Sequence, residues 1–408
     1  RYWAPSFAPR HNLPIAEARS ELRERMKVIV RDRLDADVPV GAFLSGGLDS
    51  ATVVGVATRD LGRTVHTYSI GFADKTMDES ADARLSARHL GSIHEEFIVS
   101  EADLPSVEML VAHHDGPFGD SSALPTYLVS KLAREHVTVA VTGDGGDEVF
   151  GGYPRFLGAQ LGELVPAWAG SAGRQLVGGL RQLGLGGDPS GRTHLARAGR
   201  FAAAIERPLE HKLLHWTSYF APGVVPSLLR PEVAVEAAEL MRPSDLVFGD
   251  TVGQSTLART LHHNFQTYLP DDLLVKVDRC SMAVSLETRS PLLDSGLIDF
   301  VGSLPDSYKT RGLTTKRLLR ETFADLLAPD LLKRPKRGFG VPLWTWFDNS
   351  LKPLLDDTVR SADARLYRYL DRDRVHALLW PTPKLDAPRA GQAWCLVTLE
   401  LWLRQVGL

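Results

Sequence analysis

The sequence predicts an α/β protein with a doubly wound parallel sheet and a large helical C-terminal part. Over residues 38–141, short apolar runs alternate with helical patterns, an order that is typical of parallel sheets. The first apolar run ends in a glycine-rich turn that opens a helix. From residue 257 onward the pattern is mostly helical, and we find no internal repeat.

The individual elements of the α/β region can be assigned in order. Residues 1–13 contain three prolines and suggest an extended linker, and the charged amphipathic pattern of residues 15–34 predicts a helix. Apolar runs predict four strands, at residues 38–44, 64–72, 95–99 and 136–141. Helical patterns between these runs lie at residues 79–90 and 123–135.

We expect the chain to be organised in three parts. A linker and an N-terminal helix occupy residues 1–34, and an α/β core occupies residues 35–160. Residues 161–408 form the mostly helical remainder of the same domain. Within it, residues up to about 250 are rich in Gly, Ala, Leu and Arg and suggest helices around a loop at 183–190, with no chemistry to assign.

The composition excludes several classes of protein. A length of 408 residues suits one large or two ordinary domains, and a hydrophobic content of 44% is normal for a soluble globular chain. A net charge of -3 without a long basic run argues against a nucleic-acid partner. No apolar stretch reaches the roughly 18 residues of a membrane span, and no signal peptide is recognisable. Two cysteines, Cys280 and Cys395, favour a reducing cytoplasm and leave a single disulfide open.

The first motif, residues 38–50, combines a strand, a Gly-Gly turn and a helix N-terminus. Close backbone approach, free N–H groups and the helix dipole make such a turn an anion site. Asp49 lies where a phosphate would bind, so it needs a cation, for which Mg²⁺ is the obvious candidate. The spacing fits neither a Walker A loop nor a dinucleotide fingerprint. Taken alone, the motif also fits an ordinary glycine-rich turn.

The second motif, residues 142–153, places three acids between glycines directly after a predicted strand. Alone, Asp144, Asp147 and Glu148 fit a solvated acidic turn equally well. Ligands of doubly wound sheets bind at the carboxyl ends of the strands, so this turn and the first one should face one site. Facing a phosphate loop, the acids suit Mg²⁺ ligands and a base, with Asp49 and Asp147 holding the metal from two sides.

Two further clusters are rich in charge. Residues 269–294 alternate charged with apolar side chains, which indicates buried ionisable groups of structural or functional use. We assign Glu287 and Arg289 there to the acceptor substrate. Residues 314–343 include a basic series in which Lys316 could stabilise negative charge in a transition state. A basic helix end is the simpler interpretation of Lys316 taken alone.

Together the four clusters resemble the C-terminal synthetase domain of glutamine-dependent asparagine synthetase, a member of the PP-loop family of ATP pyrophosphatases. The resemblance covers nearly the whole chain and is weakest between about 160 and 250. It implies a sheet of the PP-loop, adenine nucleotide α-hydrolase-like type. It is carried by Ser-Gly-Gly-Leu-Asp-Ser at 45–50, Gly-Asp-Gly-Gly-Asp-Glu-Val-Phe-Gly-Gly-Tyr at 143–153, Ser-Leu-Glu-Thr-Arg-Ser-Pro-Leu-Leu-Asp at 285–294 and Arg-Pro-Lys-Arg-Gly-Phe-Gly at 334–340.

The resemblance implies an ATP-dependent ligase. A carboxylate, most simply that of L-aspartate, would attack the α-phosphorus of MgATP and release pyrophosphate. Ammonia would then attack the acyl-adenylate and give an amide and AMP. The adenosine would lie against Leu44, Ile70, Thr142 and Gly143, and the pyrophosphate against Ser45, Gly46, Gly47, Asp49 and Ser50.

Three further roles come from the same resemblance. Asp49 and Asp147 would hold Mg²⁺. Asp144 matches an acid that takes a proton from the incoming nitrogen, although many asparagine synthetases have the longer Glu there. Lys316 matches a lysine that stabilises the adenylation transition state.

The chain departs from the family pattern in two places. Full-length members begin with a glutaminase domain whose catalytic cysteine is the first residue of the mature chain. Here residue 1 is Arg1, and neither cysteine suits that role, so we expect the glutaminase half to be absent, removed or on another chain. It would then be a partner domain or subunit, and a homodimer is also open. The second departure is Gly116, where an acid is expected before Pro117.

Two other functions remain open. β-Lactam synthetases and lasso-peptide cyclases share the fold and often carry tyrosine where this chain has Asp144, so Asp144 favours ammonia as the nucleophile. A biosynthetic amidotransferase for a larger acid fits the space that Gly116 leaves. An inactive ATP-binding scaffold is disfavoured because the chain retains all four charged site residues, Asp49, Asp144, Asp147 and Lys316.

Overall fold

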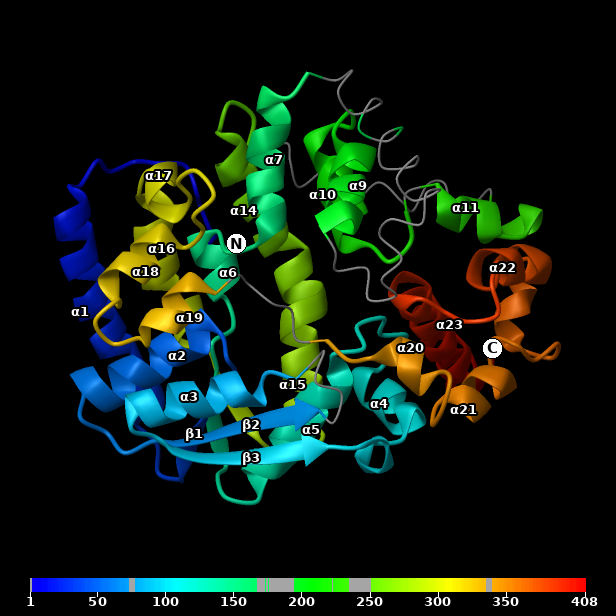
Figure 1. Ribbon diagram of the computed structural model, residues 1–408, viewed down its shortest axis with the longest axis horizontal. Helices are drawn as coiled ribbons and strands as arrows, with labels where there is room; N and C mark the ends of the chain where they lie inside the picture. The colour runs from blue at the N-terminus through cyan, green and yellow to red at the C-terminus, as the bar shows by residue number, and fades with distance from the viewer. Residues whose placement is uncertain are drawn as a thin grey trace. The chain divides into compact units, whose positions relative to one another are not determined.

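The described residues form two compact units in a computed structural model (Figure 1). The structure describes residues 2–72, 78–166, 173, 175, 194–221, 223–234, 251–334 and 340–408. Unit 1 consists of Arg1–Pro105, Ser122–Leu157 and Gly253–Gly340. Unit 2 consists of Ser106–Ser121, Gly158–Val252 and Val341–Leu408. The units alternate along the chain, so residues 253–340 pack with the α/β core; the divisions at residues 34 and 160 stay predictions.

Unit 1 is built on a five-stranded sheet in which every pairing is parallel, with the order β3-β2-β1-β4-β5. The chain runs outward from β1 to β3 and then returns to β4 on the other side of β1. This confirms the predicted doubly wound sheet and puts its switch point between β1 and β4. The strands are β1 Val40–Phe43, β2 His66–Phe72, β3 Ile93–Val99, β4 Val139–Val141 and β5 Glu287–Arg289.

The fifth strand was not predicted from the sequence. It is three residues long and pairs with β4 through Val139 and Glu287. Edge strands pair on one side only and can expose polar side chains, so β5 has no apolar run that would reveal it. The four predicted strands are present with shifted ends; β4, for example, begins at Val139 rather than at residue 136.

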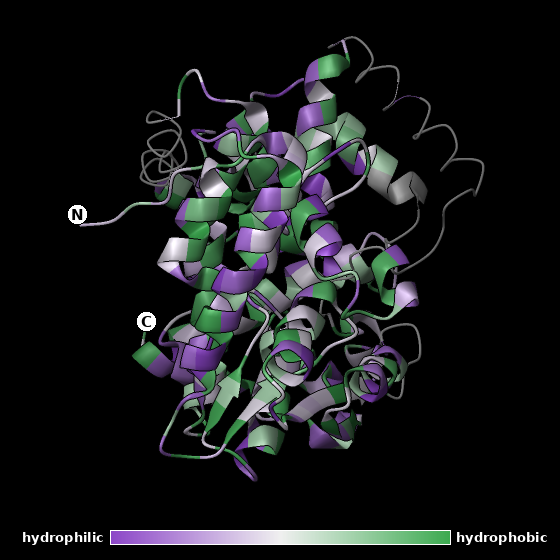
Figure 2. Cartoon of the chain, turned by 90° about the vertical axis from the view of Figure 1, so that its left-hand side faces the viewer, coloured by the Kyte–Doolittle hydropathy of each residue, from purple (hydrophilic) through white to green (hydrophobic). Residues whose placement is uncertain are grey.

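Helices cover both faces of this sheet (Figure 1). Helices α2 and α3 pack against each other and against β1 and β2, while α5 and α15 pack together and against β2 and β5. The central strands β2 and β4 are therefore almost completely buried, and Figure 2 shows green, hydrophobic stretches on the arrows of the sheet. The α-helices that lie within unit 1 are α1 Ile15–Leu34, α2 Leu48–Gly55, α3 Ser80–Leu90, α5 Ala123–Arg134, α6 Gly146–Phe150, α14 Thr256–Gln266, α15 Val275–Met282, α16 Ser295–Ser303, α17 Asp306–Lys309, α18 Arg317–Thr322 and α19 Pro329–Lys333.

Helix α1 has the bounds that its amphipathic pattern predicted. It buries Leu22, Met26 and Val30, which lie three to four residues apart and so share one face. This face joins the apolar core of unit 1, and α1 packs closely against α18. Shorter turns of unit 1 are the π-helical η1 Val56–Asp60 and η3 Leu269–Leu274 and the 3₁₀ turns η2 Glu101–Asp103 and η4 Pro291–Leu293.

Unit 2 is helical in its described part, with Leu229 and Leu370 forming an isolated bridge. Its longest helix, α23, begins after Asp386, whose side chain accepts a hydrogen bond from the Arg389 N–H, and ends at Gly407, whose φ is 80°. The predicted loop at residues 183–190 lies outside the described residues. The helices are α4 Val107–His114, α9 His194–Ala204, α10 Leu209–Thr217, α11 Val224–Leu228, α20 Leu343–Trp346, α21 Lys352–Asp357, η5 Arg365–Arg368, α22 Arg372–Leu379 and α23 Ala387–Val406; α7 Pro154–Leu164 begins in unit 1 and continues into unit 2.

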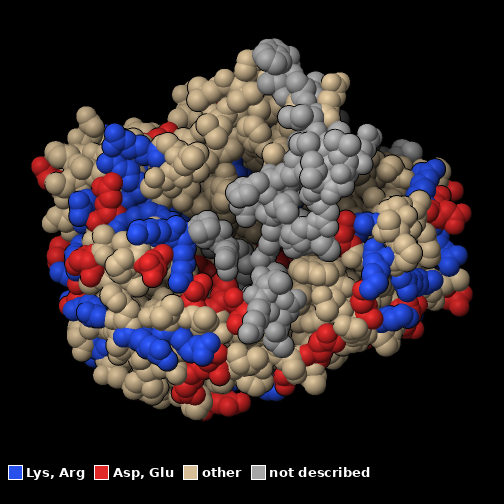
Figure 3. Space-filling model, in the orientation of Figure 1, with Lys and Arg blue, Asp and Glu red and all other residues tan. Residues whose placement is uncertain are grey.

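Two surface properties bear on the excluded functions. Among the described residues, no helix has both the length and the apolar character that crossing a bilayer requires. On the face shown in Figure 3, Lys and Arg side chains alternate with Asp and Glu side chains over unit 1. The visible face therefore carries no extended surface of a single charge.

Candidate active site

The loops after β1 and β4 meet at the switch point of the sheet. A Cβ on Gly143 would lie 2.6 Å from the Ser50 nitrogen, and one on Gly146 would lie 2.5 Å from Asp49 Cγ. Both distances are shorter than real Cβ contacts, so the two loops approach this closely only with glycine at these positions. The structure thus brings the two glycine-rich motifs together at the carboxyl end of the sheet.

The loop after β1 is held by its own serines. The Ser45 and Ser50 hydroxyls lie 3.0 Å apart, and the Gly47 N–H donates to Ser45 Oγ at 3.1 Å. Gly47 is the N-cap of α2 and has no side chain that could accept the first N–H groups of this helix. Asp49 lies in the first turn of α2. The glycine turn and the N-terminus of α2 have the geometry of an anion-binding site, and the Asp49 carboxylate lies within this site.

A buried ion cluster joins three predicted site residues. Lys316 Nζ lies 2.5 Å from Asp49 Oδ2 and 2.6 Å from Asp147 Oδ1, with side-chain exposures of 4%, 12% and 6% for Lys316, Asp49 and Asp147. A Cβ on Gly152 would overlap with atoms of Asp147 and Lys316, so glycine at this position makes room for the cluster. Taking such charges out of water is costly unless they are paired, and here they pair with one another.

The backbone of Lys316 is also unusual. Its φ of 52° lies in the left-handed region, which few residues other than glycine adopt. Such conformations cost on the order of 1–3 kcal/mol and persist where surrounding contacts enforce them. The two ion pairs are such contacts. The strained lysine therefore supports the assignment of this cluster as a functional site.

Arg320 fixes the segment that carries Lys316, a role that was not predicted. Its Nε donates to the Thr315 carbonyl at 3.0 Å, and its terminal nitrogen donates to the Leu332 carbonyl at 2.6 Å. Burial lowers the pKa of Arg320, while the nearby Asp49 and Asp147 act in the opposite direction. The residue was visible in the sequence only as part of a basic helix.

Glu148 and Tyr153 form a second buried pair behind Asp147. Burial and the neighbouring Asp147 raise the pKa of Glu148 to about 7, and the Tyr153 hydroxyl donates to Glu148 Oε1 at 2.6 Å. The Arg155 guanidinium lies 3.7 Å from the centre of the Tyr153 ring and donates to Asn264 Oδ1 at 2.6 Å. No role was predicted for Tyr153 or Arg155; the contact of Arg155 with Asn264 joins residues 109 positions apart, which no local pattern reveals.

Asp49 and Asp147 fit a divalent cation. Their carboxylates converge on one position, where the Lys316 ammonium now lies between them. Carboxylate oxygens are the ligands that Mg²⁺ prefers, and Mg²⁺ sites in nucleotide enzymes usually need only one or two of them. In the part of the chain that the structure describes, no group of three or more His, Cys, Asp or Glu forms a candidate metal site. A metal held here would therefore take its remaining ligands from phosphate or water.

The other predicted residues of the nucleotide site lie at the same strand ends. Leu44, Ile70 and Thr142 are buried, and Thr142 Oγ1 lies 2.9 Å from Ser290 Oγ. Asp144 is half-buried in the β4 loop, and its N–H donates to Thr142 Oγ1 at 3.4 Å.

The two residues assigned to the acceptor lie in a different environment. Arg289 Nε donates to Glu287 Oε1 at 2.7 Å, and an Arg289 terminal nitrogen donates to the Arg33 and Asp35 carbonyls. These contacts connect β5 to the C-terminal end of α1 rather than to the Lys316 cluster. The acceptor role of Glu287 and Arg289 stays a prediction.

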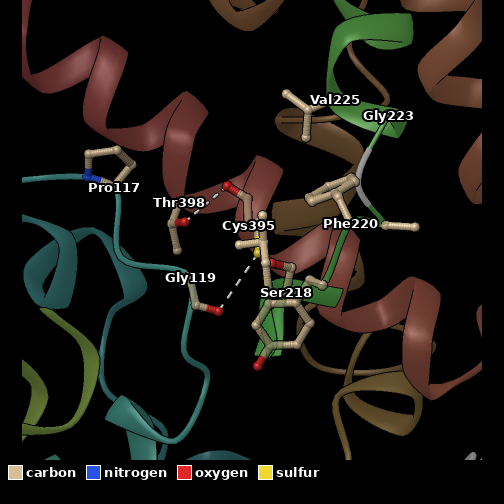
Figure 4. A pocket seen from close by; sticks show the side chains of 11 residues that line it. Pro117, Gly119, Ser218, Phe220, Gly223, Val225, Cys395 and Thr398 are labelled. Atoms are coloured by element: carbon tan, nitrogen blue, oxygen red, sulfur yellow. Dashed lines mark hydrogen bonds between the residues drawn. The ribbon is translucent and has the colours of Figure 1, made fainter. Parts of the chain in front are cut away.

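Unit 2 contains an apolar cavity of about 400 Å³ (Figure 4). Its wall includes Gly119 and Phe220 together with Cys395 and Thr398 of α23. Cys395 Sγ lies 3.8 Å from the Gly119 carbonyl. Cys280, in unit 1, is buried, and its Sγ donates to the Ala123 carbonyl at 3.3 Å.

Comparison with known proteins identifies the family. The fold and the ion cluster define a PP-loop type α/β protein, and residues 21–404 match the asparagine synthase family model. The chain belongs to the asparagine synthase family. It is 29% identical over 396 residues to asparagine synthetase [glutamine-hydrolyzing] 1 of Bacillus subtilis (strain 168), with 94% of this chain and 58% of that protein covered.

Two other relatives show the range of the family. A putative asparagine synthetase [glutamine-hydrolyzing] of Mycobacterium tuberculosis (strain ATCC 25618 / H37Rv) is 29% identical over 426 residues, with 98% of this chain and 60% of that protein covered. Amidase chry2 of Gibberella zeae is 25% identical over 391 residues, with 86% and 56% covered. The chain thus spans about three-fifths of the length of these relatives.

Proposed function

We propose that the protein is an ATP-dependent, amide-forming ligase that activates a carboxylate as its acyl-adenylate. The observation that carries this proposal is the buried Asp49–Lys316–Asp147 cluster beside a glycine-rich anion loop. Attack at the α-phosphorus requires phosphate positioning and stabilisation of developing negative charge, and these residues supply both. Membership of the asparagine synthase family supports the same reaction class.

Each group of the site has a defined task in this mechanism. The N–H group of Gly46, the Ser45 and Ser50 hydroxyls and the dipole of α2 bind the β- and γ-phosphates. Asp49 and Asp147 would hold Mg²⁺, which when bound neutralises phosphate charge and orients the leaving group. The Lys316 ammonium would stabilise the negative charge that develops at the α-phosphate.

The second half-reaction needs a base. Asp144 follows β4 by three residues and lies in the loop before α6, whose first turn carries Asp147. A carboxylate that is ionised at neutral pH can accept the proton that ammonia loses when it attacks the acyl-adenylate carbonyl. The bond from carbonyl carbon to AMP then breaks, and AMP leaves with the electron pair.

L-Aspartate is the proposed acceptor, because the most similar relatives reported above are named asparagine synthetases. A second candidate is a larger acid, the alternative that Gly116 leaves open in the sequence. A relative named as an amidase agrees with a wider range of acceptors.

The supply of ammonia is a further part of the proposal. The named relatives hydrolyse glutamine and are longer than this chain. We propose that a glutaminase domain or subunit delivers ammonia to the acyl-adenylate, and that the enzyme works in the cytoplasm, in keeping with a sequence that has only two cysteines. A homodimer stays a prediction.

Pyrophosphate release tests the proposal. The chain is incubated with MgATP, ammonium and each of a panel of carboxylic acids headed by L-aspartate. Release with aspartate supports both reaction and acceptor. Release only with another acid keeps the reaction and replaces the acceptor. No release with any acid, although ATP binds in calorimetry, would refute the ligase function for this chain.

A further inference from the structure

An ion pair with no assigned role lies directly against the phosphate loop. A Cβ on Gly46 would lie 2.5 Å from Asp82 Cβ, so α3 packs on the loop at this point. Asp82 Oδ1 accepts from an Arg334 terminal nitrogen at 2.6 Å. The two side chains are 27% and 29% exposed, so both remain open to solvent and to a ligand. The pair joins residues 252 positions apart and leaves no trace in the sequence pattern.

The segment that carries Arg334 is connected to the Lys316 segment through hydrogen bonds of Arg320. Arg334 is the C-cap residue of α19, and the Leu332 carbonyl near the end of this helix accepts a hydrogen bond from Arg320. Arg320 also binds the carbonyl of Thr315, the residue before Lys316. Arg320, which is half-buried, therefore joins the segments that carry Lys316 and Arg334 to each other. In Figure 3, basic and acidic side chains lie side by side in this region of α3, α18 and α19.

The negative charge of Asp82 lies beside the phosphate loop at Gly46 and requires a compensating positive charge. A carboxylate beside an anion site repels phosphate unless a cation neutralises it. Arg334 supplies that cation. A guanidinium has five N–H donors in a planar fork, so it can hold one carboxylate and still donate to phosphate oxygens.

We propose that Arg334 is a further pyrophosphate-binding residue, oriented by Asp82 toward the loop at Gly46. The Arg334 guanidinium donates hydrogen bonds to the β- and γ-phosphates of ATP. It continues to bind these two groups when pyrophosphate forms as the leaving group. Asp82 is a positioning residue, because its ion pair with Arg334 orients the guanidinium. This inference rests on the proposed function, because it assumes that the loop binds the phosphates of ATP.

Binding of inorganic pyrophosphate in the presence of Mg²⁺, measured by calorimetry, tests the assignment. Arg334→Ala should weaken this binding by about ten- to a hundredfold, the usual effect of losing a hydrogen bond to a charged group. Arg334→Lys should restore part of it, since a lysine keeps the charge but not the fork. AMP, which lacks the β- and γ-phosphates, should bind Arg334→Ala and wild type equally.

Asp82→Asn separates the proposal from a purely structural role. The substitution removes the carboxylate that orients the Arg334 guanidinium, so pyrophosphate should bind more weakly than to wild type but more tightly than to Arg334→Ala, while AMP binds as to wild type. If Arg334 serves only to hold Asp82 and α3, both variants should weaken pyrophosphate and AMP alike, and that result would overturn the proposal. Arg84→Ala is the matched control, because Arg84 lies on the same helix and pairs with Glu96 instead.

The possible failures are distinguishable. If the wild-type chain binds neither MgATP nor magnesium pyrophosphate, the proposed function fails and this inference fails with it. If wild type binds both and Arg334→Ala binds them equally well, only the role of Arg334 is refuted. Melting temperatures of all variants show whether a loss of binding reflects unfolding.

Discussion

At the scale of single residues, the ammonium of Lys316 occupies the position where two carboxylates converge. An ammonium and a divalent metal compete for such a position. A Mg²⁺ ion held by Asp49 and Asp147 would need that position, so the Lys316 side chain would have to move away from the two carboxylates. The strained φ of Lys316 agrees with a residue that is held ready for this exchange.

The metal assignment predicts the behaviour of two variants. Asp49→Asn and Asp147→Asn should each lower the rate of pyrophosphate release by about a hundred- to a thousandfold or more, the scale seen when one transition-state contact is lost. Both should remain folded, because Lys316 keeps one carboxylate partner. Asp325→Asn is the control, since Asp325 is exposed and pairs with Arg23. Near-normal release in either site variant would remove that residue from the metal site.

Some site residues could be predicted from the sequence and others could not. Asp49, Asp147 and Lys316 lie in motifs beside strand ends or a basic helix, where local pattern and spacing indicate chemistry. Arg334 pairs with the carboxylate of Asp82, which lies far away in the chain, and Arg320 acts through backbone carbonyls; no side-chain pattern encodes such contacts. They become visible only when the fold brings those segments together.

At the scale of elements, the approach of the β1 and β4 loops depends on glycines. Gly143→Ala would push a methyl group against the Ser50 backbone, which cannot yield as a side chain could. We expect ATP binding to be lost and the free energy of unfolding to fall by about 1–3 kcal/mol. The control is Gly116→Ala, where a Cβ meets nothing within 4 Å. Calorimetric ATP binding that is unchanged in Gly143→Ala would contradict the predicted contact between the loops.

Helices α16 and α17 are joined by a buried lysine with a measurable signature. Lys309 Nζ donates to the Leu304 carbonyl at 2.7 Å, and burial lowers the pKa of Lys309 to about 8. Between pH 8 and the ordinary lysine pKa of 10.5, the unfolded chain binds this proton and the folded chain does not. Raising the pH therefore increases the free energy of unfolding. This contribution of Lys309 is complete above pH 10.5 and is lost as the pH falls through 8.

Chemical denaturation of a lysine variant tests this linkage. The free energy of unfolding of wild type relative to Lys309→Met should rise by up to about 3 kcal/mol from pH 8 to 10.5. The exposed Lys333→Met variant should show no such change relative to wild type. Parallel pH profiles for wild type and Lys309→Met would show that Lys309 titrates normally.

The elements themselves were predictable to different degrees. Helix α1 and the four apolar strands have strong periodic patterns and were found at the correct places. Strand β5 was missed because it is short, polar and defined only by its pairing with β4. Its residues Glu287 and Arg289 were assigned to the acceptor for their charge, whereas their side chains contact each other and the end of α1.

At the scale of the whole molecule, the fold explains why distant motifs share one site. The doubly wound order returns the chain from β3 to β4 beside β1, so that motifs about 100 residues apart meet at one edge. Residues 253–340 then return to unit 1 and add β5, the lysine segment and Arg334. The charged residues of the site therefore come from three separate stretches of sequence.

The acyl-adenylate is the central claim, and isotope transfer tests it most directly. The chain is given MgATP, ammonium and L-aspartate labelled with ¹⁸O in its side-chain carboxylate, and the AMP is examined by mass spectrometry. If the carboxylate attacks the α-phosphorus and ammonia then displaces AMP, one labelled oxygen must appear in AMP. Unlabelled AMP formed together with amide, or ADP and phosphate in place of AMP and pyrophosphate, would contradict the mechanism.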